Sequence, residues 1–222
     1  MKILAVETSG KTFSAALNEN NIITASCYYE YGHIHSEIII PAVERLLKDT
    51  NNSIENIDKF AVSAGPGSFT GIRIGMTAIK TYAQMLKKPS TAADSLTILE
   101  NSVTKTKGIK VVAAIDALRN EVYVKQKNKI IIEHIDSLIE NLKKYKNKII
   151  IAGSAAEIYK DKFAKNLGEY SVSLPHTMNM PKAETLALIA ADMPDSNYAD
   201  IKPVYIRRSW AQETAKKLYA PL

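Results

Sequence analysis

The amino-acid sequence predicts an α/β protein built from two similar units. Short apolar runs typical of strands alternate with segments of helical spacing along the chain. Ile3 to Glu7 and Val111 to Asp116 are both apolar runs that end in one carboxylate and lead through a turn into a second strand. Two units with the order βββαβα imply two related domains that face each other.

Composition excludes several classes of protein. The chain has 222 residues, 46% hydrophobic and 23% charged, with 9 Gly, 8 Pro and one cysteine, Cys27. These values exclude collagen-like, low-complexity and disulfide-rich chains, and a lone cysteine favours a reducing, cytoplasmic setting. No run approaches the ~18 apolar residues of a membrane span, and the first residues do not form a signal peptide. We expect a cytoplasmic protein without a membrane segment.

Positive charge is concentrated in the second half. Residues 1–100 hold 9 Lys+Arg and 10 Asp+Glu, a net of −1, whereas residues 101–222 hold 20 and 13, a net of +7. A positively charged second half could bind an anionic partner such as RNA. The preferred interpretation is that these charges form a solvent-exposed surface without a ligand. The clustered lysines are interpreted as turn and surface solubilisers without interleaved aromatic residues: Lys125, Lys127, Lys129, Lys143, Lys144, Lys146 and Lys148.

The first unit is predicted to contain strands over 2–6, 13–17, 22–29 and 59–64. A helix is predicted over 36–48, with Ser36 as N-cap and with Pro41 starting or kinking it. Four of the nine glycines then occur within residues 65–75, before a helix that runs to Leu86 and that Ser68 or Thr70 can cap.

The glycine cluster does not match a nucleotide-binding loop, because it lacks a Gly-Lys-Ser/Thr ending and the Rossmann spacing. Gly71 and Gly75 lie one helical turn apart and would leave a flat strip for another backbone. We therefore interpret this strip as a packing surface for a helix of another subunit.

The second unit is predicted to follow a helix over 97–102 and a linker over 104–108, which divides the chain into domains 1–107 and 108–222. Strands are expected over 111–116, 121–124 and 148–152. The last of these leads through Gly153 into a helix over 155–162.

The sequence offers few catalytic candidates. Glu7-Thr8-Ser9-Gly10 could present backbone N–H groups to a phosphate and a carboxylate to its magnesium, although a tight hairpin is the commoner use of such a turn. The histidines are His33, His35, His134 and His176, and a spacing of two does not suit a metal-binding helix. Neither His-Glu-x-x-His nor Gly-x-Ser-x-Gly occurs, so no nucleophile or general base stands out.

Several motifs together resemble a known family. They are Ile3-Leu4-Ala5-Val6-Glu7-Thr8-Ser9, His35-Ser36-Glu37 leading to Pro41, Gly65-Pro66-Gly67-Ser68-Phe69-Thr70-Gly71-Ile72-Arg73-Ile74-Gly75, Ile115-Asp116-Ala117, Ala183-Glu184 and Pro203-Val204-Tyr205-Ile206-Arg207. In this order they resemble the bacterial tRNA threonylcarbamoyladenosine biosynthesis family TsaB, also called YeaZ. The resemblance implies two duplicated α/β domains of the actin-like, hsp70-like and sugar-kinase-like (ASKHA) fold.

The resemblance also implies a role. The family assists a homologous catalytic subunit, TsaD, which forms threonylcarbamoyladenosine beside the anticodon of tRNAs that read codons beginning with A. The ATPase TsaE is the third partner. Alignment on Pro89 places Ser95 and Leu99 where the catalytic subunit has its two metal-binding histidines, so we expect no metal site and no catalysis.

Nucleotide binding is expected to be weak or lost, and no cofactor is expected. ATP-binding members of the superfamily have a glycine-rich turn after the first strand of the second domain, whereas this chain has no glycine in residues 116–121. Remnants of the nucleotide site are Glu7, Thr8, Ser9 and Gly153. Two alternatives remain open: a free-standing kinase or ATPase of this fold, and a peptidase.

The resemblance places the partner contact on the helices over 36–48 and 72–86, which serve homodimers and the heterodimer with TsaD in this family. One stripe of the second helix should bury against its own sheet and the neighbouring stripe against a partner. We expect Gly75→Leu to weaken dimerisation and leave the monomer folded. The predicted interface consists of Ser36, Ile39, Val43, Ser68, Phe69, Thr70, Ile72, Arg73, Gly75, Met76, Ile79, Lys80 and Ala83.

The basic half could contact tRNA within the complex, with Arg207 and Arg208 as the first candidates. The segment 206–222, which holds Trp210, Lys216 and Lys217, could meet RNA or form a final solvated helix. The solvated helix is the preferred interpretation.

Overall fold

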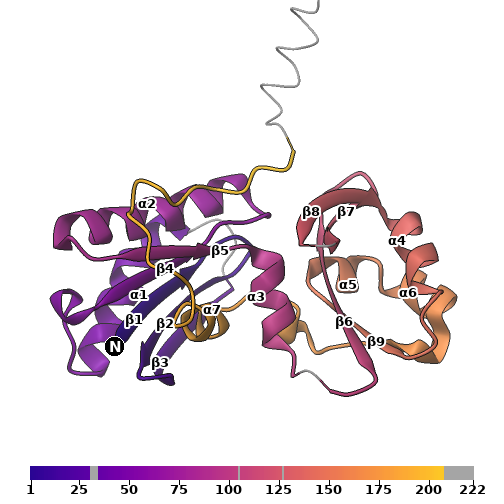
Figure 1. The fold of residues 1–222 in the computed structure, drawn as a ribbon, viewed down its shortest axis with the longest axis horizontal. Helices are drawn as coiled ribbons and strands as arrows, with labels where there is room; N and C mark the ends of the chain where they lie inside the picture. Colours follow the sequence, from indigo (N-terminus) through magenta and orange to yellow (C-terminus); the bar gives the residue numbers. More distant parts are fainter. Residues whose placement is uncertain (31–34, 105, 127, 208–222) are drawn as a thin grey trace, which may run out of the picture.

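The computed structural model describes residues 1–30, 35–104, 106–126 and 128–207. Two five-stranded sheets lie side by side, with helix α3 (Ser95–Ser102) between them (Figure 1). The first sheet consists of β1 (Lys2–Glu7), β2 (Phe13–Glu19), β3 (Ile22–Tyr29), β4 (Lys59–Ser63) and β5 (Ser90–Ala93). The second consists of β6 (Ile109–Asp116), β7 (Glu121–Gln126), β8 (Lys129–His134), β9 (Lys148–Ala152) and β10 (Ser171–Val172).

The two sheets share one topology. Their strand orders are β3-β2-β1-β4-β5 and β8-β7-β6-β9-β10, so each strand of the first sheet has a counterpart in the second. In both sheets the first three strands pair antiparallel and the last two join in parallel. The predicted duplication is confirmed.

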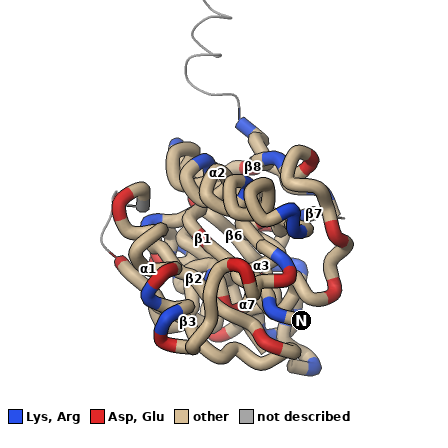
Figure 2. Tube along the Cα trace, turned by 90° about the vertical axis from the view of Figure 1, so that its left-hand side faces the viewer, with Lys and Arg blue, Asp and Glu red and all other residues tan. Residues whose placement is uncertain are grey.

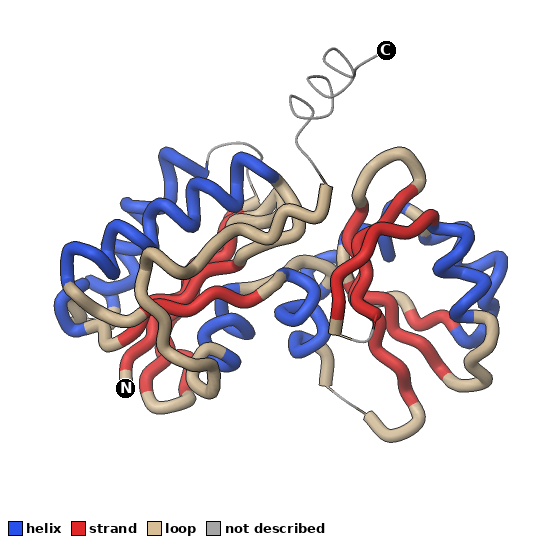
Figure 3. The backbone as a smooth tube through the Cα atoms, turned by 45° about the horizontal axis from the view of Figure 1, so that its top comes forward, coloured by secondary structure: helices blue, strands red, loops and turns tan. Residues whose placement is uncertain are grey.

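Helices cover both faces of each sheet (Figure 3). On the first sheet, α1 (His35–Asp49) and α2 (Phe69–Leu86) pack on the face of Leu4 and Val6. Helix α7 (Ala183–Ile189) packs on the opposite face, that of Ile3 and Ala5. Because alternate residues of β1 point to opposite faces and both faces are covered, the strand is apolar from Ile3 to Val6.

The second sheet is covered on one face by α4 (Ile135–Leu142), α5 (Ser154–Ile158) and α6 (Lys160–Leu167). The other face packs on α3. Helix α3 serves both cores, since Ile98 packs with the first sheet and Leu99 with the second. Short 3₁₀ turns over Ile54–Asn56, Gly168–Tyr170 and His176–Met178 complete the described elements.

The chain returns to the first sheet after completing the second. The backbone N–H of Ala183 donates to Ser14 Oγ at 3.0 Å, and Asn18 Nδ2 donates to the carbonyl of Ala187 at 2.8 Å. Farther along, the N–H of Val204 donates to the carbonyl of Ala64 at 2.8 Å. The strands of the first sheet end at Ala93 and those of the second begin at Ile109, while residues 183–204 pack on the first sheet. The domain boundary between residues 107 and 108 stays a prediction.

Several local predictions need correction. Ser36 is not an N-cap, because α1 already begins at His35, and Pro41 lies inside that helix and does not start it. Strand β5 was not predicted, and the helix expected over 155–162 is divided at Tyr159 into α5 and α6. The cap of α2 is Ser68, whose Oγ accepts from the N–H of Gly71 at 3.1 Å.

Some predictions fall on residues that the structure does not describe. These are His33, Lys127, Arg208, Trp210, Lys216 and Lys217. Within the described residues, no helix is both long enough and apolar enough to cross a membrane.

Candidate functional site

The turn after β1, predicted as a remnant of a phosphate site, is buried and internally bonded. Thr8 Oγ1 donates to the carbonyl of Gly71 at 2.8 Å, and Ser95 Oγ donates to Ser9 Oγ at 2.8 Å. The N–H of Ser68 donates to the carbonyl of Ser9 at 2.7 Å. Thr8 and Ser9 are 0% and 2% exposed. Their polar groups therefore hold the turn against the loop that precedes α2.

Two glycines of the cluster allow this contact. A Cβ at Gly67, where φ is +156°, would lie 2.1 Å from the carbonyl oxygen of Ser9. A Cβ at Gly75 would lie 2.2 Å from Thr8 Oγ1. The prediction that Gly75 accommodates the helix of another subunit is wrong, because Thr8 of its own chain fills the space beside it. The carbonyl of Gly71 accepts from the same Thr8, and a subunit contact at Gly71 stays a prediction.

Glu7 is the titratable member of this buried cluster. Its side chain is 1% exposed, its Oε1 accepts the N–H of Ser9, and its Oε2 has no hydrogen-bond partner among the described residues. Burial raises the pKa of the Glu7 carboxyl from 4.5 to about 7, against the smaller opposing effect of its hydrogen bonds. A substantial fraction of Glu7 is therefore protonated at neutral pH.

The second unit also uses its candidate residues internally. Gly153 has a φ of +118°, and a Cβ there would lie 2.3 Å from the carbonyl oxygen of Ala114, so the glycine permits close packing on β6. Asp116 Oδ1 accepts from Tyr159 OH at 3.0 Å. Burial and this hydrogen bond raise the pKa of the Tyr159 hydroxyl to about 12.

The turn between β6 and β7 contains no glycine but adopts a backbone conformation that glycine favours. Leu118, Arg119 and Asn120 all have left-handed backbone, with φ between 57° and 63°. Arg207 Nη1 donates to the carbonyl of Ala117 at 2.6 Å, and its Nη2 pairs with Glu121. These contacts hold Arg207 within its own chain, and its predicted contact with RNA stays a prediction.

Most apolar residues of the predicted interface lie in the core of the first unit. These residues are 0–4% exposed, which leaves them little surface for a partner; they are Ile39, Val43, Ile72, Met76, Ile79 and Ala83. Of the six, Ile39 lines the groove between α1 and α2 that is described below. The expectation that one stripe of α2 buries against its own sheet is confirmed. The other stripe faces solvent and includes Arg73 and Thr77, while Lys80 is half-buried.

An exposed cluster lies at the start of α2. Phe69 is 42% exposed, and the guanidinium carbon of Arg73 lies 4.0 Å from the centroid of its ring. Arg73 Nε donates to Tyr205 OH at 3.0 Å, and the rings of Phe69 and Tyr205 lie 5.1 Å apart. Ser36, Ser68 and Thr70 are exposed nearby. Tyr205 was not among the predicted interface residues, although it belongs to the motif over 203–207.

A groove continues from this cluster between α1 and α2. Its volume is ≈ 430 Å³, and it is mostly apolar; its lining comprises Ser36, Ile39, Ile40, Arg73, Ile74, Thr77, Ala78, Thr81 and Tyr82. Ile40 is 41% exposed. We call this groove together with Phe69, Arg73 and Tyr205 the α1/α2 face.

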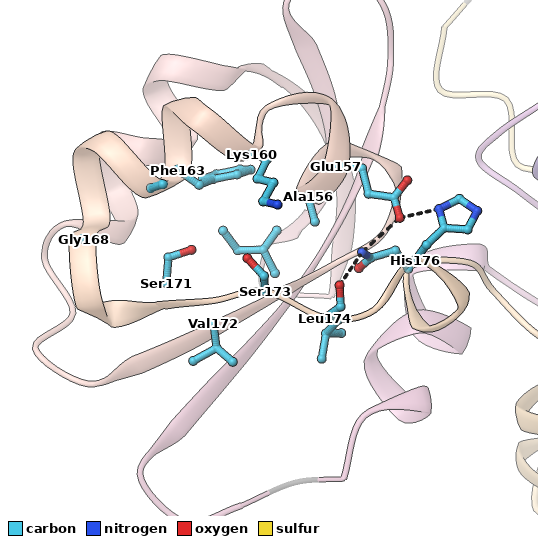
Figure 4. Close-up of a pocket in the computed structure, with 13 residues that line it drawn as sticks. Ala156, Glu157, Lys160, Phe163, Gly168, Ser171, Val172, Ser173, Leu174 and His176 are labelled. Atoms are coloured by element: carbon cyan, nitrogen blue, oxygen red, sulfur yellow. Dashed lines mark hydrogen bonds and ion pairs between the residues drawn. The ribbon is translucent and has the colours of Figure 1, made fainter.

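A smaller recess of ≈ 310 Å³ lies between α5, α6 and the segment 171–174 (Figure 4). Asn179 Nδ2 donates to Glu157 Oε1 at 3.2 Å and to the carbonyl of Leu174 at 3.4 Å. The imidazole of His176 lies 2.7 Å from both Glu157 and Glu30, and Glu30 follows β3 of the first unit. Polar groups of this recess thus link the two units, and the hydrogen bonds of the two carboxylates raise the pKa of His176.

A second polar link joins the units at α3. Lys125 Nζ lies 3.0 Å from Asp94 Oδ2 and also donates to Thr97 Oγ1. The Lys125 side chain is 19% exposed. The interpretation of Lys125 as a surface solubiliser is therefore wrong, because it binds the residue that caps α3.

The two positions aligned with metal-binding histidines serve packing. Ser95 Oγ lies 3.2 Å from Ser63 Oγ in addition to its bond to Ser9, and Leu99 is in the core between α3 and the second sheet. In the part of the chain that the structure describes, no group of three or more His, Cys, Asp or Glu side chains is arranged to hold a metal ion.

The duplicated topology is that of the actin-like, hsp70-like and sugar-kinase-like fold. An activator of 2-hydroxyisocaproyl-CoA dehydratase from Clostridium difficile, solved with bound ADPNP, shares this fold at 12% identity and a TM-score of 0.55, over 92% of this chain and all of that one. The chain belongs to the TsaD family, tRNA N6-adenosine threonylcarbamoyltransferase, whose family model matches residues 30–207.

Within this family the chain is similar to TsaB proteins. It is 28% identical to the tRNA threonylcarbamoyladenosine biosynthesis protein TsaB of Bacillus subtilis over 96% of both chains. A Pseudomonas aeruginosa protein described as similar to the peptidase YeaZ superimposes with a TM-score of 0.76 at 25% identity, over 93% of this chain and 99% of that one. The resemblance stated from the motifs is confirmed.

Proposed function

We propose that this protein is a non-catalytic subunit that dimerises with and activates a TsaD catalytic subunit in forming threonylcarbamoyladenosine in tRNA. The ATPase TsaE is the third component, and the protein forms a homodimer when alone. We assign it to the cytoplasm. The α1/α2 face carries this proposal, because it is the exposed apolar surface of a helix pair whose opposite side is already packed on the first sheet.

The chemistry of the α1/α2 face suits a protein partner. Aromatic rings and arginine are enriched among the residues that dominate binding energy at protein interfaces. Arg73 is held between Phe69 and Tyr205, so it loses little freedom on binding. The adjoining groove exposes Ile40 beside Ile74 and offers a place for an apolar side chain of a partner helix.

The turn after β1 supports a role without catalysis. A turn that binds a phosphate does so through backbone N–H groups and hydroxyls that are free to contact it. Here the hydroxyls of Thr8 and Ser9 are bonded within the chain, and the carbonyl of Ser9 accepts from Ser68. We therefore propose that ATP binds weakly or not at all and that the subunit works without a cofactor.

A reconstituted reaction tests the proposal. The cognate TsaD and TsaE would be assayed for tRNA modification with and without this chain, and with a Phe69→Ala/Arg73→Glu variant. Ile158→Ala is the matched control, since Ile158 is 58% exposed and lies in the second unit. We expect wild type and the control to support modification and the double variant to lose most of it, in step with weaker TsaD binding in calorimetry.

The results that would overturn the proposal are specific. Equal modification without this chain would remove the activator role. If the double variant activates TsaD normally, the α1/α2 face is not the surface that contacts TsaD. Calorimetry with ATP and magnesium separates the rival class, because a free-standing kinase or ATPase should bind ATP tightly without TsaD.

A further inference from the structure

Lysines and tyrosines gather at the end of the second unit that holds the amino ends of β6 and β9. They come from β6, the segment between the end of α4 and the first residue of β9, the C-terminal end of α6 and the following 3₁₀ turn. We call them the lysine–tyrosine patch; its members are Lys110, Lys143, Lys144, Tyr145, Lys146, Lys148, Lys165 and Tyr170. The interpretation of these lysines as lacking aromatic neighbours is corrected here.

The two rings of the patch are accessible. Tyr145 is 44% exposed and Tyr170 is 41% exposed. Lys110 Nζ lies 3.3 Å from the centroid of the Tyr145 ring, which places a positive charge against that ring. Both tyrosines line a recess of ≈ 710 Å³ together with Lys143, Lys146 and Lys165.

Positive charge exceeds negative charge on the patch. Its six lysines lie beside two glutamates, Glu140 and Glu169. Glu140 pairs with Lys143 at 2.6 Å, whereas the contact of Lys148 is to the backbone carbonyl of Glu169 at 2.9 Å. Lys146 and Lys165 have no hydrogen bond or ion pair within the described part of the chain and are exposed.

The first unit lacks such segregation. In Figure 2, which looks onto that side of the molecule, basic and acidic segments alternate around α1 and β3. The patch belongs to the second unit, which lies on the other side of α3 from α1 and α2 (Figure 1). A ligand on the patch therefore leaves the α1/α2 face free.

We propose that the lysine–tyrosine patch binds RNA in a single-stranded or looped segment. Lysines neutralise phosphates, and exposed aromatic rings stack on unpaired bases; the combination distinguishes a single strand from other polyanions. An acidic peptide would use the lysines but gain no stacking on Tyr170, and a blunt duplex hides its base faces. The inference is independent of the proposed contact with TsaD.

Fluorescence anisotropy on the isolated full-length protein tests it. The probes are a labelled RNA hairpin with an unpaired loop, a blunt RNA duplex of the same length and a poly-glutamate peptide, measured between about 50 and 200 mM salt. Lys146→Gln/Lys165→Gln removes two charges from the patch. Lys11→Gln/Lys48→Gln removes two exposed charges from the first unit as the matched control. Tyr170→Ala removes a ring, and Tyr170→Phe keeps it.

The hairpin should bind more tightly than the duplex or the peptide. The patch lysine variant should reduce the slope of log K against log salt by about 1.4, because each phosphate contact to a single strand contributes about 0.7. Tyr170→Ala should weaken hairpin binding about 5- to 140-fold, and Tyr170→Phe should preserve it. Unchanged melting temperatures would confirm that the variants are folded.

Four outcomes would overturn the inference. They are absence of hairpin binding by the wild-type protein, an equal change of slope in the Lys11/Lys48 control, equal losses in the two Tyr170 variants, and peptide binding as tight as hairpin binding. The last outcome would assign the patch to an acidic protein. None of these results depends on whether TsaD is bound or activated, so the two proposals fail separately.

Discussion

Thr8 and Gly75 are in direct contact, and this contact ties α2 to the turn after β1. The Thr8 Oγ1 atom lies 2.2 Å from the position that a Cβ at Gly75 would occupy, and the same oxygen donates to the carbonyl of Gly71. The glycine spacing in α2 therefore fits the fold of the monomer. The turn that resembles a nucleotide-binding segment acts here as a packing element.

Gly75→Ala should destabilise the monomer. Overpacking against Thr8 should cost about 1–3 kcal/mol, which outweighs the helix-propensity gain of at most about 1 kcal/mol. Urea unfolding would measure the difference. Gly10→Ala is the control, since the nearest atom to a Cβ at Gly10 lies 3.7 Å away. If Gly75→Ala is as stable as wild type but no longer dimerises, the result would instead support the glycine strip of α2 as a contact with another subunit.

Glu7 should make stability fall between pH 4.5 and 7. Burial raises the folded-state pKa of Glu7 to about 7. Over this range the unfolded chain releases the Glu7 proton while the folded chain retains it, so rising pH favours unfolding. Glu7→Gln keeps the size and cannot ionise. As pH rises from 4.5 to 7, the unfolding free energy of wild type should therefore fall by about 3 kcal/mol relative to that of Glu7→Gln. A pH-independent difference would contradict it.

His176 should titrate above its ordinary pKa of 6.5. Hydrogen bonds to Glu30 and then to Glu157 favour the imidazolium, and the ring is near the surface, where solvent screens the interaction. This contribution to stability should be present below the unfolded-state pKa and should be lost as pH rises through the folded-state value. NMR titration should show a lower His176 pKa in Glu30→Gln. No change in that variant would mean that the link between the units is absent in solution.

Lys125→Met should weaken the junction between the units. The change removes a charged hydrogen bond to Asp94 and one to Thr97, with an expected loss of about 1–3 kcal/mol in unfolding free energy. Lys129→Met serves as the comparison, because Lys129 is exposed at the start of β8. Equal melting temperatures for the two variants would show that the Lys125 contact contributes nothing measurable.

Sequence patterns predicted those structural features that depend only on residues close together in the chain. The strand alternation, the helical spacing and the Ser68 cap of α2 are local properties, and the order of elements revealed the duplication. Strand β5 escaped prediction because its sequence, Ser-Thr-Ala-Ala, lacks a bulky apolar run, and only its pairing with β4 defines it.

Long-range contacts decided the site. The apolar stripe of α2 was visible in the sequence, but only packing on the first sheet shows that Met76 and Ile79 are unavailable to a partner. The approach of Thr8 to Gly75 joins residues far apart in the chain, and no periodicity encodes it.

The sequence by itself thus determined the class of fold, the family and the segregation of charge into the second half. The tertiary structure decided which side chains remain exposed. It buried the turn after β1, paired Lys125 and Arg207 within the chain, and placed Tyr170 with Tyr145 among the lysines. The physical reason is that net charge and the spacing of apolar residues can be read from the sequence directly. Burial and pairing depend instead on which strands and helices pack against each other in the folded protein.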